Sequence, residues 1–295
     1  MEQRKSNLRD SMVVFPNVKI NIGLSITGKR PDGYHNIESV MYPVGWCESL
    51  ELVDRSVANT NDSMIQSRVE SGKVRFTSYG IPIPGDASTN LCIRVFHLLE
   101  EWFNLPTVDI HLLKTLPIGA GLGGGSADAA FCLRALKDYF ELKISDHEAK
   151  RLLAVIGSDC PFFWENKPVF SFGRGDEMRP IGLDLSGKWI MLVYPDLAIS
   201  TKEAYAGVEP KASSFDLQML QSVPIEAWKE VVFNDFEKSL FPTYRILETV
   251  KNEIYELGAL YASMTGSGST LYGIFDTRPE LPETWIEYPH WVGKL

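Results

Sequence analysis

The sequence of 295 residues contains no apolar run of the roughly 18 residues that a helix needs to cross a bilayer. Its first residues, MEQRKSNLRDSMVVFPN, carry charges but lack the apolar segment of a secretory signal peptide. We therefore expect no membrane span and no export, and the expected location is the cytoplasm.

Positive charge is also in short supply. Lys and Arg number 29 against 38 Asp and Glu, so the formal net charge is −9, and the basic residues are scattered. A nucleic acid or an anionic membrane is not expected as a partner, because both attract clustered positive charge. A small nucleotide stays possible, since it needs only local positive potential.

Cysteine is scarce. The four cysteines, Cys47, Cys92, Cys132 and Cys160, stand far apart and form no C-x-x-C pair. This spacing favours reduced thiols over a disulfide framework or a zinc site.

The length and a hydrophobic share of 44% are sufficient for two domains of ordinary size. We predict a boundary near residue 172, which divides the chain into residues 1–172 and 173–295. Strand and helix patterns are mixed along the chain. They predict strands over residues 18–26, 49–53, 73–80, 108–117 and 188–195, a hairpin over 167–182, and helices over 88–103, 126–142, 145–157 and 244–257.

Two of these elements carry local signals. In the first strand, apolar residues from Val18 to Ile26 alternate with Lys19, Asn21 and Ser25, which predicts a half-buried strand with Lys19 and Asn21 on its polar face. The helix over 145–157 opens with the capping-box spacing of Ser145 and Glu148.

The segment LPIGAGLGGGSADAA, residues 116–130, has glycine at five of the seven positions from 119 to 125. Glycines of this density let a bare backbone approach a ligand closely. Between a strand and a helix, the backbone N–H groups and the helix dipole favour an anion, so we predict a phosphate site. The Ser126 hydroxyl can serve a phosphate oxygen or a metal ion.

Two common phosphate loops fit this segment poorly. A Walker A loop requires lysine where Gly125 stands. The dinucleotide fingerprint is met by Gly119, Gly121 and Gly124, but no strand ending in an acidic residue follows about 20 residues later.

A third pattern, P-x-x-x-G-L-G-[GS]-[GS]-[SA]-[SA], is met from Pro117 to Ala127, and here the sequence resembles the GHMP kinases. The stretches VKINIGLSITGKRPDGYHNIES, GSDCPFF and MTGSGSTLYGIF support the resemblance and occur in the family's order. TGKRPDGYH is typical of members whose substrate carries a cytidine diphosphate. The chain departs from the family pattern at Asn17 and Val18, where P-A is usual before the lysine, and at Ser158 and Cys160, where Ala and Val are common.

The resemblance implies an α+β, two-domain GHMP kinase fold, with a ribosomal S5 domain 2-like N-terminal domain and a ferredoxin-like C-terminal domain. It implies ATP as co-substrate and Mg²⁺ as its metal, with Ser126 as a candidate ligand. The implied catalytic residues are Lys19 and Asp159. The implied ATP loop consists of Pro117, Ile118, Gly119, Ala120, Gly121, Leu122, Gly123, Gly124, Gly125, Ser126 and Ala127. The implied substrate residues are Asn21, Tyr34, His35, Thr201, Tyr205, Gly266, Ser267 and Gly268.

These assignments are chemically sensible. Phosphoryl transfer needs charge neutralisation and a group that accepts the alcohol proton, which a lysine and an aspartate can supply. Tyr34 and Tyr205 could enclose a pyrimidine while His35 reads its edge. Without the resemblance, Lys19 would be a solvated strand residue and Asp159 a loop cap.

The resemblance thus implies an ATP-dependent kinase that acts on a hydroxyl of a cytidine diphosphate-linked small molecule in the non-mevalonate isoprenoid pathway. Another GHMP kinase, for homoserine, mevalonate or a sugar, is the first alternative. A dinucleotide-binding oxidoreductase is the second. A catalytically silent nucleotide-binding module is the third, against which Lys19 and Asp159 argue.

Overall fold

The computed structural model describes residues 10–56 and 64–295. The chain forms two compact units, each built from several segments. Unit 1 comprises residues 1–16, 47–116 and 125–164, and unit 2 comprises 17–46, 117–124 and 165–295. The division into domains 1–172 and 173–295 stays a prediction.

Unit 1 contains a five-stranded sheet with the order β1-β4-β7-β6-β5. β6 and β7 run parallel, and the other neighbours run antiparallel. The strands are β1 (Ser11–Val14), β4 (Ser49–Asp54), β5 (Ile65–Ser71), β6 (Val74–Gly80) and β7 (Val108–Lys114). The helices are the 3-10 turn η1 (Ala87–Thr89), α1 (Leu91–Glu100), α2 (Gly124–Tyr139), α3 (Asp146–Ile156) and α4 (Cys160–Glu165).

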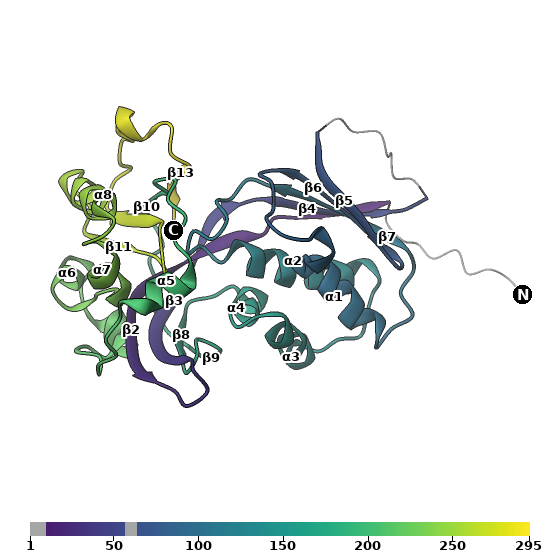
Figure 1. Ribbon diagram of the computed structural model, residues 1–295, viewed down its shortest axis with the longest axis horizontal. Coiled ribbons are helices and arrows are strands. Elements are labelled where there is room, and N and C mark those ends of the chain that lie inside the picture. Colours follow the sequence, from purple (N-terminus) through teal and green to yellow (C-terminus); the bar gives the residue numbers. More distant parts are fainter. Residues whose placement is uncertain (1–9, 57–63) are drawn as a thin grey trace, which may run out of the picture. The chain divides into compact units, whose positions relative to one another are not determined.

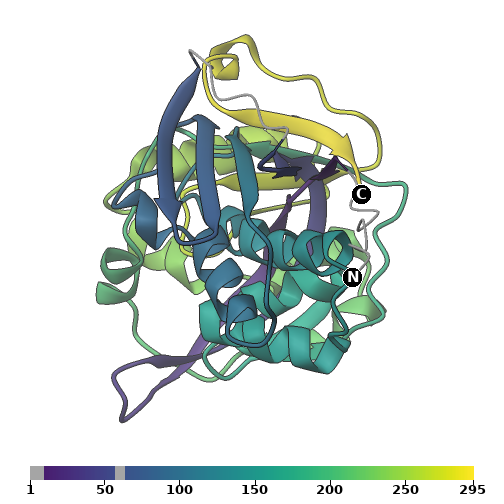
Figure 2. The same ribbon diagram turned by 90° about the vertical axis from the view of Figure 1, so that its right-hand side faces the viewer.

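The helices of unit 1 lie on one face of this sheet (Figures 1 and 2). Val108, Ile110 and Leu112 of β7 are fully buried, whereas the exposed Leu113 falls on the alternate face, as a strand covered on one side requires. At the end of β7 the chain leaves the sheet and enters the glycine segment, which leads into α2.

The predicted helices of unit 1 are confirmed, and their starts have local causes. Asn90 caps α1 by accepting a hydrogen bond from the Cys92 N–H at 2.9 Å. Ser145 and Glu148 form the predicted capping box of α3. The short helix α4, which starts immediately after Asp159, was not predicted.

Unit 2 contains two four-stranded sheets, with the orders β2-β3-β8-β9 and β11-β12-β10-β13. The strands are β2 (Asn17–Lys29), β3 (His35–Cys47), β8 (Val169–Phe172), β9 (Glu177–Pro180), β10 (Trp189–Val193), β11 (Tyr261–Met264), β12 (Leu271–Phe275) and β13 (His290–Lys294). The helices are α5 (Thr201–Ala206), α6 (Trp228–Val231), α7 (Asp235–Leu240), α8 (Arg245–Glu256) and the 3-10 turns η2 (Leu217–Ser222), η3 (Ile225–Ala227) and η4 (Glu283–Trp285).

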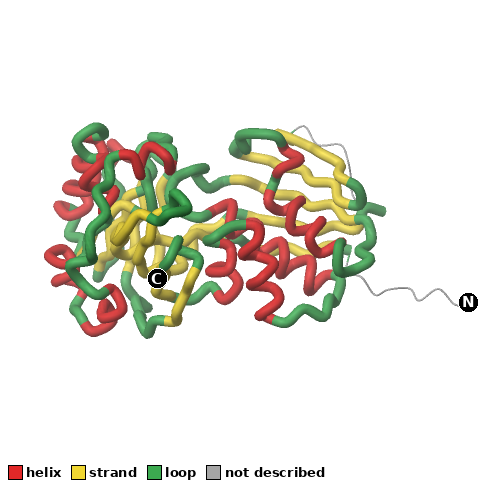
Figure 3. Tube along the Cα trace, turned by 60° about the horizontal axis from the view of Figure 1, so that its bottom comes forward, coloured by secondary structure: helices red, strands yellow, loops and turns green. Residues whose placement is uncertain are grey.

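The core of unit 2 joins helices to strands that are distant in sequence. Met191 of β10 and Leu271 of β12 pack in one cluster with Val250 and Ile254 of α8. Figure 3 shows the helices of this unit in red beside its strands in yellow. The predicted hairpin, the strand at 188–195 and the helix at 244–257 are confirmed as β8–β9, β10 and α8.

The expectation of a half-buried first strand is wrong. Both faces of β2 are buried from Asn17 to Leu24, and Lys19 and Asn21 are only 4% and 2% exposed. The polar face is covered because backbone from two glycine-containing turns packs against it, as described below.

Among the described residues, no helix combines the length and the apolar character that crossing a membrane would require. The four cysteines are free thiols, of which Cys47 is exposed and the other three are buried.

Candidate active site

The predicted site residues fall on a few elements. Lys19 and Asn21 lie on β2, Tyr34 and His35 at the start of β3, Thr201 and Tyr205 on α5, and Gly266–Gly268 in the turn between β11 and β12. Residues 117–123 form the turn before α2, and Gly124–Ala127 form the first turn of that helix. Asp159 lies between α3 and α4.

Lys19 and Asn21 point to the same side of β2, because side chains two residues apart in a strand share a face. The Lys19 ammonium donates hydrogen bonds to Asn21 Oδ1 and to the Gly121 carbonyl, the latter at 3.2 Å. The structure therefore brings the predicted catalytic lysine of unit 2 to the glycine segment, with its positive charge held in place.

Asn21 is itself held by further hydrogen bonds. Its Nδ2 donates to Ser39 Oγ at 2.8 Å, and Ser39 Oγ in turn donates to the Gly23 carbonyl at 2.6 Å. The Asn21 backbone N–H donates to Thr265 Oγ1 at 3.0 Å. These contacts orient the Asn21 amide so that its oxygen faces Lys19.

The glycine segment takes a backbone path that favours glycine. Gly119, Gly121 and Gly123 have φ values of +70°, +78° and +73°, in the left-handed region. The Leu122 carbonyl accepts from the Lys19 N–H at 3.0 Å, so the turn is hydrogen-bonded to β2. A Cβ at Gly121 would lie 2.1 Å from the Thr265 carbonyl oxygen. Packing against a second turn therefore requires glycine at position 121.

That second turn runs from Thr265 to Thr270. Its Thr265 hydroxyl donates to the Gly121 carbonyl at 3.2 Å, and the Thr270 N–H donates to the Ala120 carbonyl at 3.3 Å. Gly266 and Gly268 have φ values of +57° and +88°. Thr265 and Gly121 are 144 residues apart in the sequence. The two motifs that contain them are nevertheless neighbours in unit 2.

Asn234, which no sequence motif singles out, holds this second turn. Asn234, 2% exposed, donates from Nδ2 to the carbonyls of Met264 and Gly266 at 2.7 and 2.9 Å. Its Oδ1 accepts from the Phe236 N–H at 3.0 Å and so caps α7. An asparagine before a short helix signals a cap, but nothing local reveals its second role.

The aromatic rings of the predicted substrate residues contact neighbouring side chains. The rings of His35 and Tyr205 stack, with centroids 4.8 Å apart and planes inclined by 21°. Tyr34 is 59% exposed, and the Arg174 guanidinium carbon lies 5.3 Å from its ring centroid. A base that stacked on the same face of Tyr205 would have to displace His35. Thr201 is exposed at the first position of α5.

Ser126 and Asp159 belong to unit 1. The side chains of Ser126 and Cys160 are hydrogen-bonded. Burial raises the pKa of the Cys160 thiol to about 11, against the hydrogen bond from Ser126 that lowers it. The thiol is therefore protonated at neutral pH and does not act as a nucleophile. Next to it, Asp159 is half-buried, and its Oδ1 accepts from the Ser158 hydroxyl at 3.5 Å.

Metal-ligating side chains do not gather in the described part of the chain, where no group of three or more His, Cys, Asp or Glu could hold an ion. Magnesium bound to a nucleotide needs only one or two protein oxygens, because phosphate and water supply the others. A hydroxyl such as that of Ser126 suits this smaller task.

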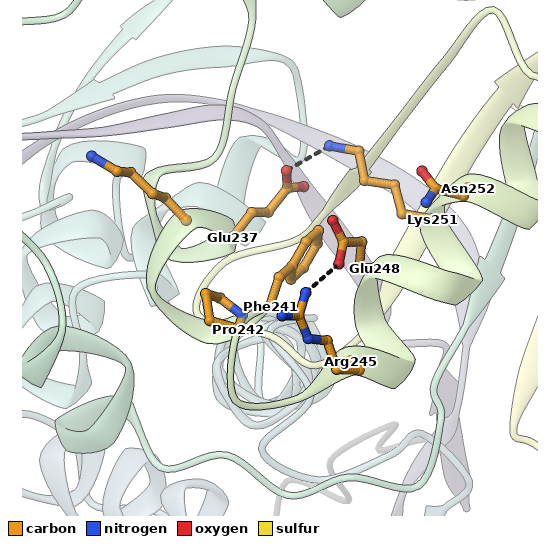
Figure 4. Close-up of a pocket in the computed structure, with 8 residues that line it drawn as sticks. Glu237, Phe241, Pro242, Arg245, Glu248, Lys251 and Asn252 are labelled. Carbon is orange, nitrogen blue, oxygen red and sulfur yellow. Dashed lines mark hydrogen bonds and ion pairs between the residues drawn. The ribbon is translucent and has the colours of Figure 1, made fainter.

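A separate pocket of about 400 Å³ lies between α7 and α8 (Figure 4). Four of its charged groups form two pairs, Lys251 with Glu237 at 2.5 Å and Arg245 with Glu248 at 3.0 Å. None of the predicted site residues lines it.

Comparison with known families identifies the class of protein. Residues 90–166 match the GHMP kinases N terminal domain, and residues 224–284 match the GHMP kinases C terminal domain. The α+β fold with its glycine segment before α2 is therefore that of the GHMP kinases, and the dinucleotide-binding alternative is not supported.

Full-length relatives narrow the family further. A 4-diphosphocytidyl-2-C-methyl-D-erythritol kinase of Cytophaga hutchinsonii is 45% identical over 91% of this chain and 94% of the relative. The protein of the same name from Parabacteroides distasonis is 44% identical over 96% of this chain and all of the relative. A crystal structure of 4-(cytidine 5'-diphospho)-2C-methyl-D-erythritol kinase superposes with a TM-score of 0.73 at 26% identity, covering 96% of this chain and 98% of that one. The chain belongs to the 4-diphosphocytidyl-2-C-methyl-D-erythritol kinase family.

Proposed function

We propose that this chain transfers the γ-phosphoryl group of ATP to the 2-hydroxyl of 4-diphosphocytidyl-2-C-methyl-D-erythritol, in the non-mevalonate route to isoprenoid precursors. The observation that carries this proposal is the 44–45% identity to kinases of that name over nearly the whole of both chains. Such similarity favours this substrate over homoserine, mevalonate or a sugar.

Residues 117–127 hold the ATP phosphates in this proposal. Support comes from the turn of left-handed glycines that ends at the N-terminus of α2, a helix of 16 residues whose first N–H groups favour an anion. Mg²⁺ would neutralise phosphate charge when bound, and the Ser126 hydroxyl is the protein oxygen that we propose for it.

Lys19 and Asp159 carry the chemistry in this proposal. The substrate hydroxyl oxygen forms a bond to the γ-phosphorus, the bond from that phosphorus to the ADP oxygen breaks, and the hydroxyl proton passes to the Asp159 carboxylate. The Lys19 ammonium stabilises the charge on the transferred group, as fixed cations do in phosphoryl transfer. Its two hydrogen bonds, to Asn21 Oδ1 and the Gly121 carbonyl, support this role because they hold the ammonium beside the phosphate turn.

The substrate is bound, in this proposal, by Asn21, Tyr34, His35, Thr201, Tyr205 and the turn Gly266–Gly268. The aromatic residues at the start of β3 and on α5 support a site for a pyrimidine, since a base stacks readily on such rings. Two of these rings, those of His35 and Tyr205, stack on each other.

A coupled assay of ADP release tests the proposal. The purified protein is incubated with ATP, Mg²⁺ and one of three acceptors: 4-diphosphocytidyl-2-C-methyl-D-erythritol, homoserine or mevalonate. We expect release with the cytidine substrate and a kcat/KM at least a hundredfold lower with the other two. Equal or better turnover of homoserine or mevalonate would overturn the proposal, and so would a failure to release ADP with any acceptor.

A further inference from the structure

A cluster of three buried charged side chains lies at the end of β7 in unit 1. The Lys114 ammonium donates to Glu48 Oε1 at 2.6 Å and to Asp128 Oδ2 at 2.8 Å. All three side chains are at most 6% exposed. No residue of this cluster was assigned a role from the sequence, although an aspartate within the small apolar run after the glycines was a visible signal.

The cluster holds both ends of the glycine segment. At the first end, Glu48 Oε2 accepts hydrogen bonds from the N–H groups of Thr115 and Leu116, at 3.2 and 3.4 Å. At the other end, Asp128 lies near the start of α2, two residues beyond Ser126. Lys114 is hydrogen-bonded to both carboxyl groups, so it links the chain that leaves β7 to the helix that follows the glycines.

The charges of the cluster balance if one carboxyl group is protonated. Glu48 accepts hydrogen bonds from the Lys114 ammonium and from two backbone N–H groups. Burial raises the pKa of Asp128 well above its usual range, against the lowering effect of Lys114, and Glu48 adds to the rise. Burial alone would lower the pKa of Lys114, but the facing Asp128 and Glu48 raise it. Burial and the neighbouring Glu48 thus favour the neutral form of the Asp128 carboxyl group.

We propose that Lys114, bonded to Glu48 and Asp128, is a positioning residue for ATP: it fixes the two ends of the glycine segment in the geometry that receives the phosphates. This inference rests on the proposed role of residues 117–127. A buried ion pair contributes little net stability compared with well-packed apolar residues, because its desolvation cost offsets its attraction. A cluster at this place is therefore better explained by the geometry that it imposes than by stability.

The test measures ATP binding directly, by calorimetric titration in the absence of the acceptor, and then kcat at saturating ATP. Asp128→Leu removes the hydrogen bond between Lys114 and α2. Glu48→Gln with Lys114→Met removes the cation and its buried counter-charge together, which guards against a simple failure to fold. We expect both variants to raise the Kd for ATP at least tenfold, which corresponds to about 1.4 kcal/mol, while kcat at saturating ATP stays within threefold.

Two controls separate positioning from stability. Asp128→Asn keeps an oxygen for Lys114, so its Kd for ATP should stay within threefold of wild type. Asp109 is a buried carboxylate near the start of β7, at the end of the strand opposite to Lys114, and it pairs with Arg55 and Arg75. Asp109→Asn should lower the melting temperature yet leave the Kd for ATP within twofold.

The inference is overturned if Asp128→Leu binds ATP as wild type does, or if Asp109→Asn weakens ATP binding as much as Asp128→Leu. A wild-type protein that binds ATP but does not phosphorylate the cytidine substrate would refute the proposed acceptor and leave the positioning role of Lys114 intact.

Discussion

Gly121 and Thr265 meet so closely in unit 2 that a Cβ on the glycine would lie 2.1 Å from the threonine carbonyl oxygen. Real Cβ atoms essentially never lie within 3.0 Å of another such heavy atom. The neighbour is backbone and cannot rotate aside, so the glycine segment and the turn at 265–270 are matched in shape. Lys19 donates to the carbonyl of this same glycine, which ties the predicted catalytic lysine to that match.

The first prediction follows from this contact. Gly121→Ala should lower kcat/KM for ATP more than tenfold, because the Thr265 carbonyl must move and the Gly121 carbonyl that holds Lys19 moves with it. Gly119→Ala is the matched control. Its φ of +70° is similar, but no atom lies within 4 Å of the added Cβ. The control should lose on the order of 1–2 kcal/mol of stability from backbone strain and keep most of its activity. Equal losses in the two variants would show that backbone strain alone explains the effect.

The second prediction concerns Asp159. Asp159→Asn should retain ATP binding and reduce kcat by roughly 10²–10⁴-fold, the usual contribution of a general base, because the amide cannot accept the hydroxyl proton. The measurement is steady-state ADP release with a parallel titration of ATP. Asp138→Asn, at an exposed aspartate late in α2, should leave both quantities unchanged. Near-normal turnover of Asp159→Asn would remove this residue from the mechanism.

The third prediction tests the pyrimidine site. Tyr34→Ala should raise KM for the cytidine substrate by roughly 5- to 150-fold, since stacking of a base on an aromatic ring contributes on the order of 1–3 kcal/mol. KM for ATP should stay within about twofold. Trp102→Ala, at another half-exposed aromatic residue, should change neither KM. If KM for ATP rises instead, Tyr34 belongs to the nucleotide-donor site.

The fourth prediction concerns the metal. Removal of Mg²⁺ with a chelator should abolish ADP release, and added Mg²⁺ should restore it. Ser126→Ala should raise the Mg²⁺ concentration that gives half-maximal rate at least threefold, because one protein oxygen is lost. Cys160→Ala removes the hydrogen-bonded neighbour of Ser126 but leaves the hydroxyl, so it should shift that concentration by less than twofold. An unchanged Mg²⁺ requirement in Ser126→Ala would exclude Ser126 as a ligand.

Local signals in the sequence were enough to predict much of the molecule. The capping box of Ser145 and Glu148 and the glycine segment between a strand and a helix act over a few residues, so their consequences can be derived from spacing. The family motifs indicated the candidate catalytic and binding residues. The observed ends of some helices differ slightly from the predicted ones. For example, α1 spans Leu91–Glu100, whereas the predicted helix spans 88–103.

Only the tertiary structure decided what those residues contact. Lys19 reads as the solvated face of a strand, yet it is buried because the turn around Gly121 covers it. Lys114 meets Glu48 from 66 residues away, and Thr265 meets Gly121 from 144 residues away. The sequence determined the local shapes, since these depend on neighbouring residues. Burial and pairing depend on which distant backbone closes over a side chain, and the energy of that closure is shared by many residues, so no short stretch of sequence contains it.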